Sequence, residues 1–133
     1  MHGPELCAGS IVYSEEKILL IRRGAEPEKG LWSLPGGRVQ KGESIRHAAL
    51  RELKEESNLE GKFEEMMGWV DLLIGEHRYV IVNLRCSVSN ASNLKAGDDA
   101  AEAKFFKLEE LHGLEMNDRT RNFLFSLQPP MSY

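Results

Sequence analysis

The sequence predicts an α/β sandwich, formed by a single domain spanning residues 1–133. Strand-like runs lie on both sides of one amphipathic helical pattern, and a second helical pattern lies near the end of the chain. No internal repeat is present. A chain of this length can bury about two-thirds of its unfolded surface, which is sufficient for one hydrophobic core.

The apolar periodicity predicts five strands and two helices. The strands are expected at residues 6–14, 17–23, 62–74, 78–88 and 104–108. The helices are expected at about residues 44–57, with Ser44 as N-cap, and at 117–127, with Asn117 as N-cap. The segments 24–30 and 91–103 are predicted to be loops.

The polar turn at residues 14–16 predicts a hairpin between the first two strands. Residues 18–21 are apolar without alternation, so the second strand is expected to be central and covered on both faces. Pro35 and the pair Gly36-Gly37 are predicted to break any regular element.

The strand at 78–88 alternates in polarity, so its two faces are expected to differ. One face carries Val80, Val82, Leu84, Cys86 and Val88. The other carries Asn83, Arg85 and Ser87. The two cysteines, Cys7 and Cys86, are predicted to be free thiols in the core, because both lie in apolar strands.

The composition is that of an ordinary globular protein, with 41% hydrophobic and 29% charged residues and a net charge of −4. A nucleic-acid-binding surface is not expected, since such surfaces are usually basic. No apolar run approaches the ~20 residues of a membrane span, and the first ten residues lack the pattern of a signal peptide. We therefore expect a cytoplasmic protein with no membrane partner.

The predicted central helix carries three glutamates, Glu52, Glu55 and Glu56, within an arc of about 100° at the rim of its apolar stripe. Like charges three and four residues apart repel one another by a few tenths of a kcal/mol per pair. A solvated surface helix is one interpretation. A cation site is the other, because Mg²⁺ prefers several oxygen ligands and Gly36-Gly37 allow backbone to approach closely.

This region resembles the sequence motif of the Nudix hydrolases. The motif is a Gly, five residues, a Glu, seven residues and then Arg-Glu-aliphatic-x-Glu-Glu-x-Gly-aliphatic. The matching positions are Gly37, Glu43, Arg51, Glu52, Leu53, Glu55, Glu56 and Leu59. Asn58 replaces the second family Gly; Asn tolerates the left-handed conformation best after Gly, unless Gly61 ends the helix instead. The flanking segments are similar to those of small bacterial ADP-ribose pyrophosphatase-like members.

The resemblance implies an α/β/α sandwich around a mixed sheet and a hydrolase that uses Mg²⁺ or Mn²⁺. It implies metal ligation by Glu52, Glu55, Glu56 and the Gly36 carbonyl. Arg51 would orient a motif glutamate, and Glu43 would act indirectly. The general base comes from the motif, as with Glu55, or from a distant loop, where Glu102 ranks before Asp98 and Asp99.

The nucleotide end is less clearly specified by the sequence. Candidate substrate contacts are Arg23, Trp32, His77 and Asp98. Trp32 could instead be a core residue. The substrate expected from overall likeness is ADP-ribose or another ADP-sugar, cleaved to AMP and a sugar phosphate. Two alternatives stay open, a (deoxy)nucleoside triphosphate pyrophosphohydrolase and a non-catalytic nucleotide-sensing module. A homodimer is compatible with the resemblance.

Overall fold

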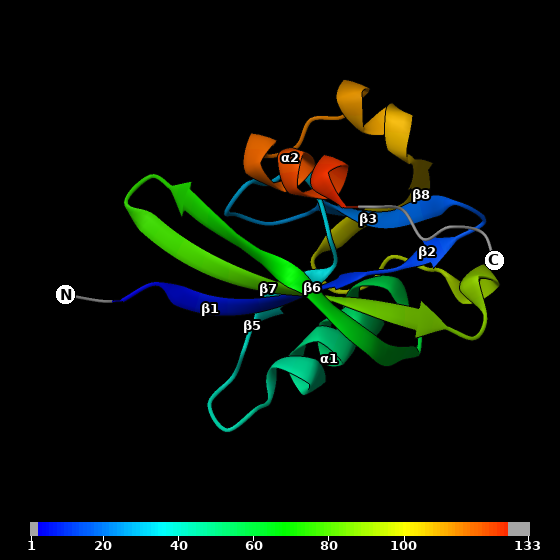
Figure 1. Ribbon diagram of the computed structural model, residues 1–133, viewed down its shortest axis with the longest axis horizontal. Helices are drawn as coiled ribbons and strands as arrows, with labels where there is room; N and C mark the ends of the chain where they lie inside the picture. The colour runs from blue at the N-terminus through cyan, green and yellow to red at the C-terminus, as the bar shows by residue number, and fades with distance from the viewer. Residues whose placement is uncertain (1–2, 128–133) are drawn as a thin grey trace.

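The structure is a computed structural model that describes residues 3–127. Two β-sheets lie between the helices α1 (Ile45–Ser57) and α2 (Asp118–Ser126), which are on opposite sides in Figure 1. The predicted α/β class and sandwich architecture are confirmed. Among the described helices, none has the length and apolar character needed to cross a bilayer.

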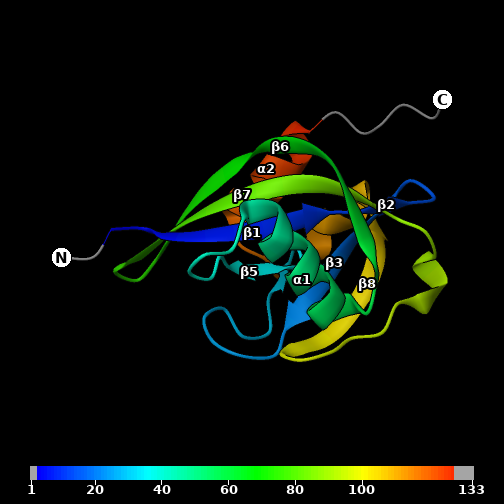
Figure 2. The ribbon, with the colours of Figure 1, turned by 90° about the horizontal axis from the view of Figure 1, so that it is seen from below.

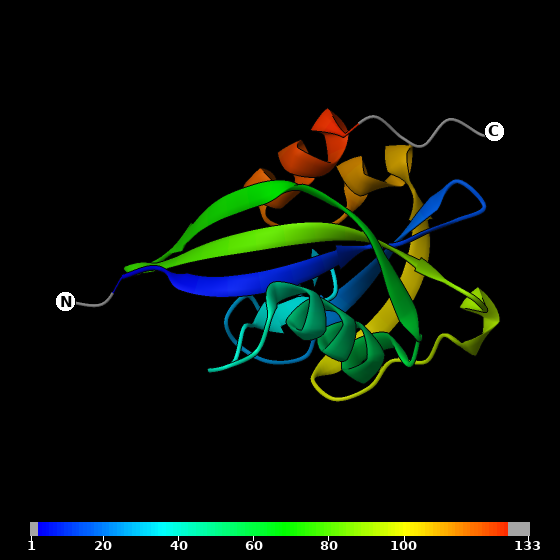
Figure 3. The same cartoon turned by 60° about the horizontal axis from the view of Figure 1, so that its bottom comes forward.

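The first sheet is mixed. Its strand order is β5 (Gly36–Arg38), β1 (Glu5–Ile11), β7 (His77–Val88) and β6 (Gly61–Ile74). β1 runs parallel to β7, whereas the β1–β5 and β6–β7 pairs are antiparallel. The long β6–β7 ribbon, predicted as two antiparallel strands, crosses the whole molecule in Figure 3.

The second sheet is antiparallel. β3 (Lys17–Arg23) pairs with β2 (Tyr13–Ser14), β4 (Trp32–Ser33) and β8 (Ala100–Lys107). The central position predicted for β3 is confirmed, because Ile18, Leu19, Leu20 and Ile21 are all at most 2% exposed. Short 3-10 helices lie at Ala91–Asn93 and Leu108–Gly113.

Three local predictions were wrong. Gly36-Gly37 do not break the chain but begin β5, because residues without side chains can pair closely against β1. The segment 91–103 is not all loop: β8 begins at Ala100. The predicted first hairpin is limited to the pairs Tyr13–Ile18 and Ser14–Lys17. Residues 5–11 do not pair with β3, because they pair with β5 and β7 instead.

The hydrophobic core has two halves, one beneath each helix. The half at α1 contains Ala48, Ala49 and Leu53 packed on residues of β1, β3 and β7. The half at α2 contains Leu124, Leu111, Phe106 and neighbouring side chains. β3 serves both, since Leu19 faces α1 and Leu20 faces α2. The predicted free thiols are confirmed as buried Cys7 and Cys86.

Candidate active site

Helix α1 is fixed at both ends by its own sequence. The Ser44 hydroxyl accepts a hydrogen bond from the His47 amide at 3.1 Å, as an N-cap does. At the other end Asn58 has φ 65°, the left-handed conformation expected for the position where the family motif has Gly. The helix lies over β1 and β5 (Figure 2). Burial of its Ala48, Ala49 and Leu53 face sets Glu52 and Glu56 against β5.

The glycine pair at the start of β5 makes room for these two glutamates. The Gly36 amide donates a hydrogen bond of 2.7 Å to Glu56 Oε1. A β-carbon on Gly37 would lie only 2.5 Å from Glu52 Oε1, and one on Gly36 would lie 2.5 Å from the Ala8 carbonyl oxygen. Gly36 therefore requires glycine, because a side chain would collide with the backbone of the neighbouring strand, whereas a side chain at Gly37 would displace the Glu52 carboxylate.

Arg51 gathers the other carboxylates of the helix. Its Nε and Nη2 donate to the two oxygens of Glu43 at 2.7 and 3.0 Å, and its Nη1 contacts Glu52 at 2.9 Å and Glu55 at 3.2 Å. The bonds from Arg51, with help from the Gln40 amide, lower the pKa of Glu43 to about 2. Glu43 is thus a fixed anion that orients Arg51.

Glu52 and Glu56 are the carboxylates that lose hydration. Burial raises the pKa of Glu56 to about 8, against the opposing effect of the Gly36 amide. Burial also raises the pKa of Glu52, and the charges of Glu55 and Asp98 add to this effect. Two desolvated carboxylates one turn apart disfavour each other's charge, and a bound cation would relieve both penalties.

The donor set fits a hard divalent cation, although the ligands do not converge. Within residues 3–127, no three acidic, His or Cys side chains are gathered in a metal-binding geometry. The reason is visible in the contacts: Glu55 is exposed and turned toward Arg51, while Glu56 is held by Gly36. Carboxylate oxygens are nevertheless the ligands that Mg²⁺ and Mn²⁺ prefer, and Mg²⁺ retains several waters.

The loop before β8, which carries Asp98, packs on this helix. The Gly97 amide donates to the Glu56 carbonyl at 3.2 Å, and a β-carbon on Gly97 would lie 2.5 Å from the Glu55 carbonyl oxygen. Asp98 is therefore the neighbour in sequence of a residue that contacts α1, and its negative charge helps to raise the pKa of Glu52. Glu102 is exposed on β8, where it lies opposite Arg22.

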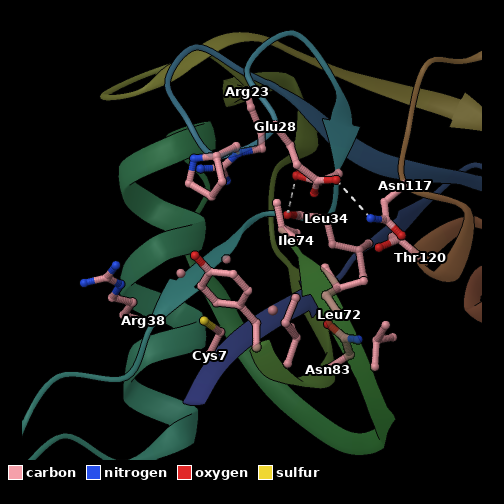
Figure 4. Close-up of a pocket in the computed structure, with 18 of the residues that line it drawn as sticks. Cys7, Arg23, Glu28, Leu34, Arg38, Leu72, Ile74, Asn83, Asn117 and Thr120 are labelled. Atoms are coloured by element: carbon pink, nitrogen blue, oxygen red, sulfur yellow. Dashed lines mark hydrogen bonds between the residues drawn. The ribbon is translucent and has the colours of Figure 1, made fainter. Parts of the chain in front are cut away.

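A pocket opens on the other side of the glycine pair. It is bounded by β1, β5, β6, β7, the loop before β4 and the start of α2 (Figure 4). Its walls are mainly apolar and include Leu34, Val70, Leu72, Ile74 and Ile81. Polar groups on its lining are Arg23, Glu28, Arg38, Tyr79, Asn83, Asn117 and Thr120.

The predicted substrate contacts are divided by the structure. Arg23 lines the pocket, and its charge also lowers the pKa of Glu56, so it lies between the pocket and the acidic helix. Trp32 packs edge-on against Phe106 at 4.8 Å between ring centroids and also lines the pocket, so its contact with a substrate stays a prediction. His77 is exposed at the start of β7, outside the pocket lining.

Of the polar lining residues named above, only Arg23 was among the sequence candidates. Asn83 was assigned only to the polar face of its strand, although an amide between Val82 and Leu84 in the middle of a long strand was a sequence signal that could have identified it. Glu28 and Asn117 join through a hydrogen bond of 2.9 Å from Asn117 Nδ2 to Glu28 Oε2, across 89 positions of sequence. Neither that pairing nor the position of Thr120 leaves a local sequence pattern.

Comparison with known proteins decides the family. A family model described as the NUDIX domain matches residues 3–127. The chain belongs to the Nudix family. It is 38% identical over 109 residues to the ADP-ribose pyrophosphatase of Methanocaldococcus jannaschii, a match that covers 81% of this chain and 64% of that protein. The chain therefore spans less than two thirds of this relative's length.

Solved structures support the Nudix fold. The MutT NUDIX hydrolase from Burkholderia pseudomallei matches with a TM-score of 0.85 and 24% identity. The match covers 96% of this chain and 100% of that chain. The NUDIX domain of Shewanella oneidensis NrtR, solved in complex with ADP ribose, matches with a TM-score of 0.77 and 21% identity, over 93% of this chain and 86% of that one. The predicted family resemblance is thus confirmed.

Proposed function

We propose that this Nudix protein is a metal-dependent pyrophosphohydrolase that cleaves ADP-ribose, or a related ADP-sugar, to AMP and a sugar phosphate. One observation carries the proposal. The same short strand, β5, presents Gly36 and Gly37 both to the desolvated Glu52–Glu56 pair and to the pocket. A pyrophosphate at this strand would therefore lie between a cation site and a site for the rest of the nucleotide.

The residues of α1 take distinct roles in this proposal. Glu52 and Glu56, with Glu55 after release from Arg51 and with the Gly36 carbonyl, would hold Mg²⁺ or Mn²⁺. A bound cation would neutralise charge on the pyrophosphate oxygens, which a protein of net charge −4 would otherwise repel. Arg51 keeps Glu52 and Glu55 in position, because Glu43 fixes its guanidinium at 2.7 and 3.0 Å.

Residues outside the helix complete the site. Arg23 and Arg38 line the pocket beside the glycine pair, where cationic side chains would bind the phosphates. The proposed general base is Asp98, because its loop packs on the end of α1 and its charge already acts on Glu52. Glu102 is the second candidate, and Glu55 the third.

The choice of ADP-ribose is supported by two relatives. The M. jannaschii protein, at 38% identity, is named an ADP-ribose pyrophosphatase. The NrtR NUDIX domain, similar in fold, was solved with ADP ribose. A pocket with apolar walls and few polar groups is also the usual form of a site for a nucleoside.

The test is product analysis after incubation with Mg²⁺ and a panel of ADP-ribose, ADP-glucose, NADH and the nucleoside triphosphates. The variant Glu56→Gln removes a proposed ligand with little change in shape. Glu60→Gln is its matched control, because Glu60 is an exposed neighbour whose carboxylate pairs with Lys54 at 3.2 Å, away from the glycine pair.

AMP and ribose 5-phosphate from ADP-ribose, lost in Glu56→Gln and kept in Glu60→Gln, would support the whole proposal. Release of pyrophosphate from triphosphates, with ADP-ribose untouched, would replace the substrate by the triphosphate alternative. Binding of nucleotides without turnover of any of them would show a sensing module and refute the enzymatic proposal.

A further inference from the structure

Asn83 occupies an unusual place in the first sheet. It lies in the middle of β7, and its partners on both neighbouring strands are glycines: Gly9 on β1 and Gly68 on β6. A β-carbon on Gly9 would lie 2.4 Å from Asn83 Oδ1. The carboxamide therefore occupies space that the absence of a side chain at Gly9 leaves open, and any larger residue at position 9 would displace it.

The carboxamide is enclosed without being satisfied. Asn83 is 1% exposed, and Oδ1 makes no hydrogen bond to any residue between 3 and 127. A buried polar atom in this state costs about 1–3 kcal/mol, so native proteins nearly always give it a partner. An apolar residue in this central strand would avoid the cost. The arrangement points to a partner that arrives from outside the chain.

The pocket is the route by which that partner arrives. Asn83 lines it together with Ile81 and Tyr79, which alternate on the same face of β7. In Figure 4, Asn83 lies on the far side of the pocket from α1, with Leu72 nearby, whereas Arg38 lies beside that helix. A nucleotide with its phosphates near Arg23, Arg38 and the acidic helix would place its base toward Asn83.

The lining at that end fits a heterocycle better than a sugar or a phosphate. Leu34, Val70, Leu72 and Ile81 present apolar surface suited to the faces of an aromatic ring. Charged groups there would be needed for a phosphate, but Arg23 and Arg38 lie at the other end. The Asn83 carboxamide adds a hydrogen-bonding group to this apolar lining, which suits a ring that carries donors and acceptors on its edge.

We propose that Asn83 determines base specificity: a small turn of its carboxamide would bring Oδ1, which has no partner among residues 3–127, to the pocket, where it accepts a hydrogen bond from the exocyclic amino group of a nucleobase. This inference rests on the proposed function for the orientation of the nucleotide. It extends that function by assigning a residue of β7, outside the Nudix motif, to substrate choice. It also gives Gly9 a role, because a β-carbon there would lie 2.4 Å from this acceptor and displace it.

The experiment measures binding, so it does not depend on turnover. Calorimetric titration compares AMP with purine riboside 5′-monophosphate, which lacks the amino group and is otherwise the same. Wild type should bind AMP about 10-fold or more tightly than the analogue, as expected when a buried acceptor loses its donor. Asn83→Leu, of similar size and without polar atoms, should bind the two nucleotides within about 2-fold of each other.

Controls separate this role from a structural one. Asn83→Leu should unfold in urea at a concentration equal to or above that of wild type, since it removes an unsatisfied polar group. Asn83→Ala is a second variant if Leu does not fit beside Gly9, and it should also lose the preference for AMP. Arg22→Gln changes an exposed residue outside the pocket and should keep the preference.

Equal binding of AMP and the analogue by wild type would overturn the inference. So would a wild-type preference that survives in the Asn83 variants, or an absence of AMP binding. Failure of the proposed function has a different signature: ADP-ribose would not be hydrolysed, while the preference for AMP and its dependence on Asn83 would persist.

Discussion

Glu56→Gln should make the stability of the metal-free protein less dependent on pH. Glu56 is 6% exposed, and its pKa rises from 4.5 to about 8 on folding. The folded state therefore holds this proton more tightly than the unfolded state does. Stability contributed by the protonated group is present at low pH and is lost as pH rises from about 4.5 to 8.

The magnitude follows from the pKa shift. At pH 7 the group lies 2.5 pH units above its unfolded pKa of 4.5, which at about 1.4 kcal/mol per unit costs about 3 kcal/mol. Glutamine does not titrate, and its carbonyl oxygen can still accept the hydrogen bond from the Gly36 amide. Between pH 5 and pH 8, the free energy of unfolding of wild type should therefore fall by about 3 kcal/mol relative to that of the variant.

The assay is urea unfolding in EDTA at several pH values between 5 and 8. Parallel pH profiles for wild type and Glu56→Gln would refute the reasoning that burial disfavours this carboxylate. Millimolar Mg²⁺ at pH 8 should stabilise wild type more than Glu56→Gln.

Substitutions at Arg51, Gly37 and Asn58 test other parts of the site and helix. Arg51→Gln removes a guanidinium that bonds three carboxylates, and kcat/KM should fall at least about 10-fold in steady-state assays. Gly37→Ala places a β-carbon 2.5 Å from Glu52 Oε1, so Mg²⁺ affinity by calorimetry should fall about 10-fold, whereas Gly113→Ala, in open space, should not change it. Asn58→Gly should stay within about 0.5 kcal/mol of wild type in urea unfolding, but Asn58→Val should lose more than about 1 kcal/mol, because φ is 65° there.

Agreement between sequence and structure is best where the interactions are local. Ser44 caps the start of α1 and Asn58 caps its end, as predicted, because a cap depends on residues within one turn. The arc of Glu52, Glu55 and Glu56 follows from helical geometry alone. The long β6–β7 pair was also predictable, since a short turn joins two adjacent runs.

The differences arise where distant segments meet. Gly36 and Gly37 were predicted to interrupt structure, but pairing with β1 makes them a strand. The contact between the loop at Gly97 and α1, through which the charge of Asp98 acts on Glu52, also left no pattern in the sequence, and the choice between Glu102 and Asp98 as general base stays a prediction. His77 lies outside the pocket because the β6–β7 ribbon places its turn beyond the lining.

The sequence by itself determined the acidic helix, its caps and the family, because the Nudix motif lies within one helix and the loop before it. Only the tertiary structure decided which carboxylates are desolvated, which acidic residue approaches them and which polar atom is enclosed in the pocket. Glu56 is buried by β5, and Asn83 is flanked by Gly9 and Gly68 from two other strands. Burial depends on contacts between segments far apart in the chain, and local patterns do not specify those contacts.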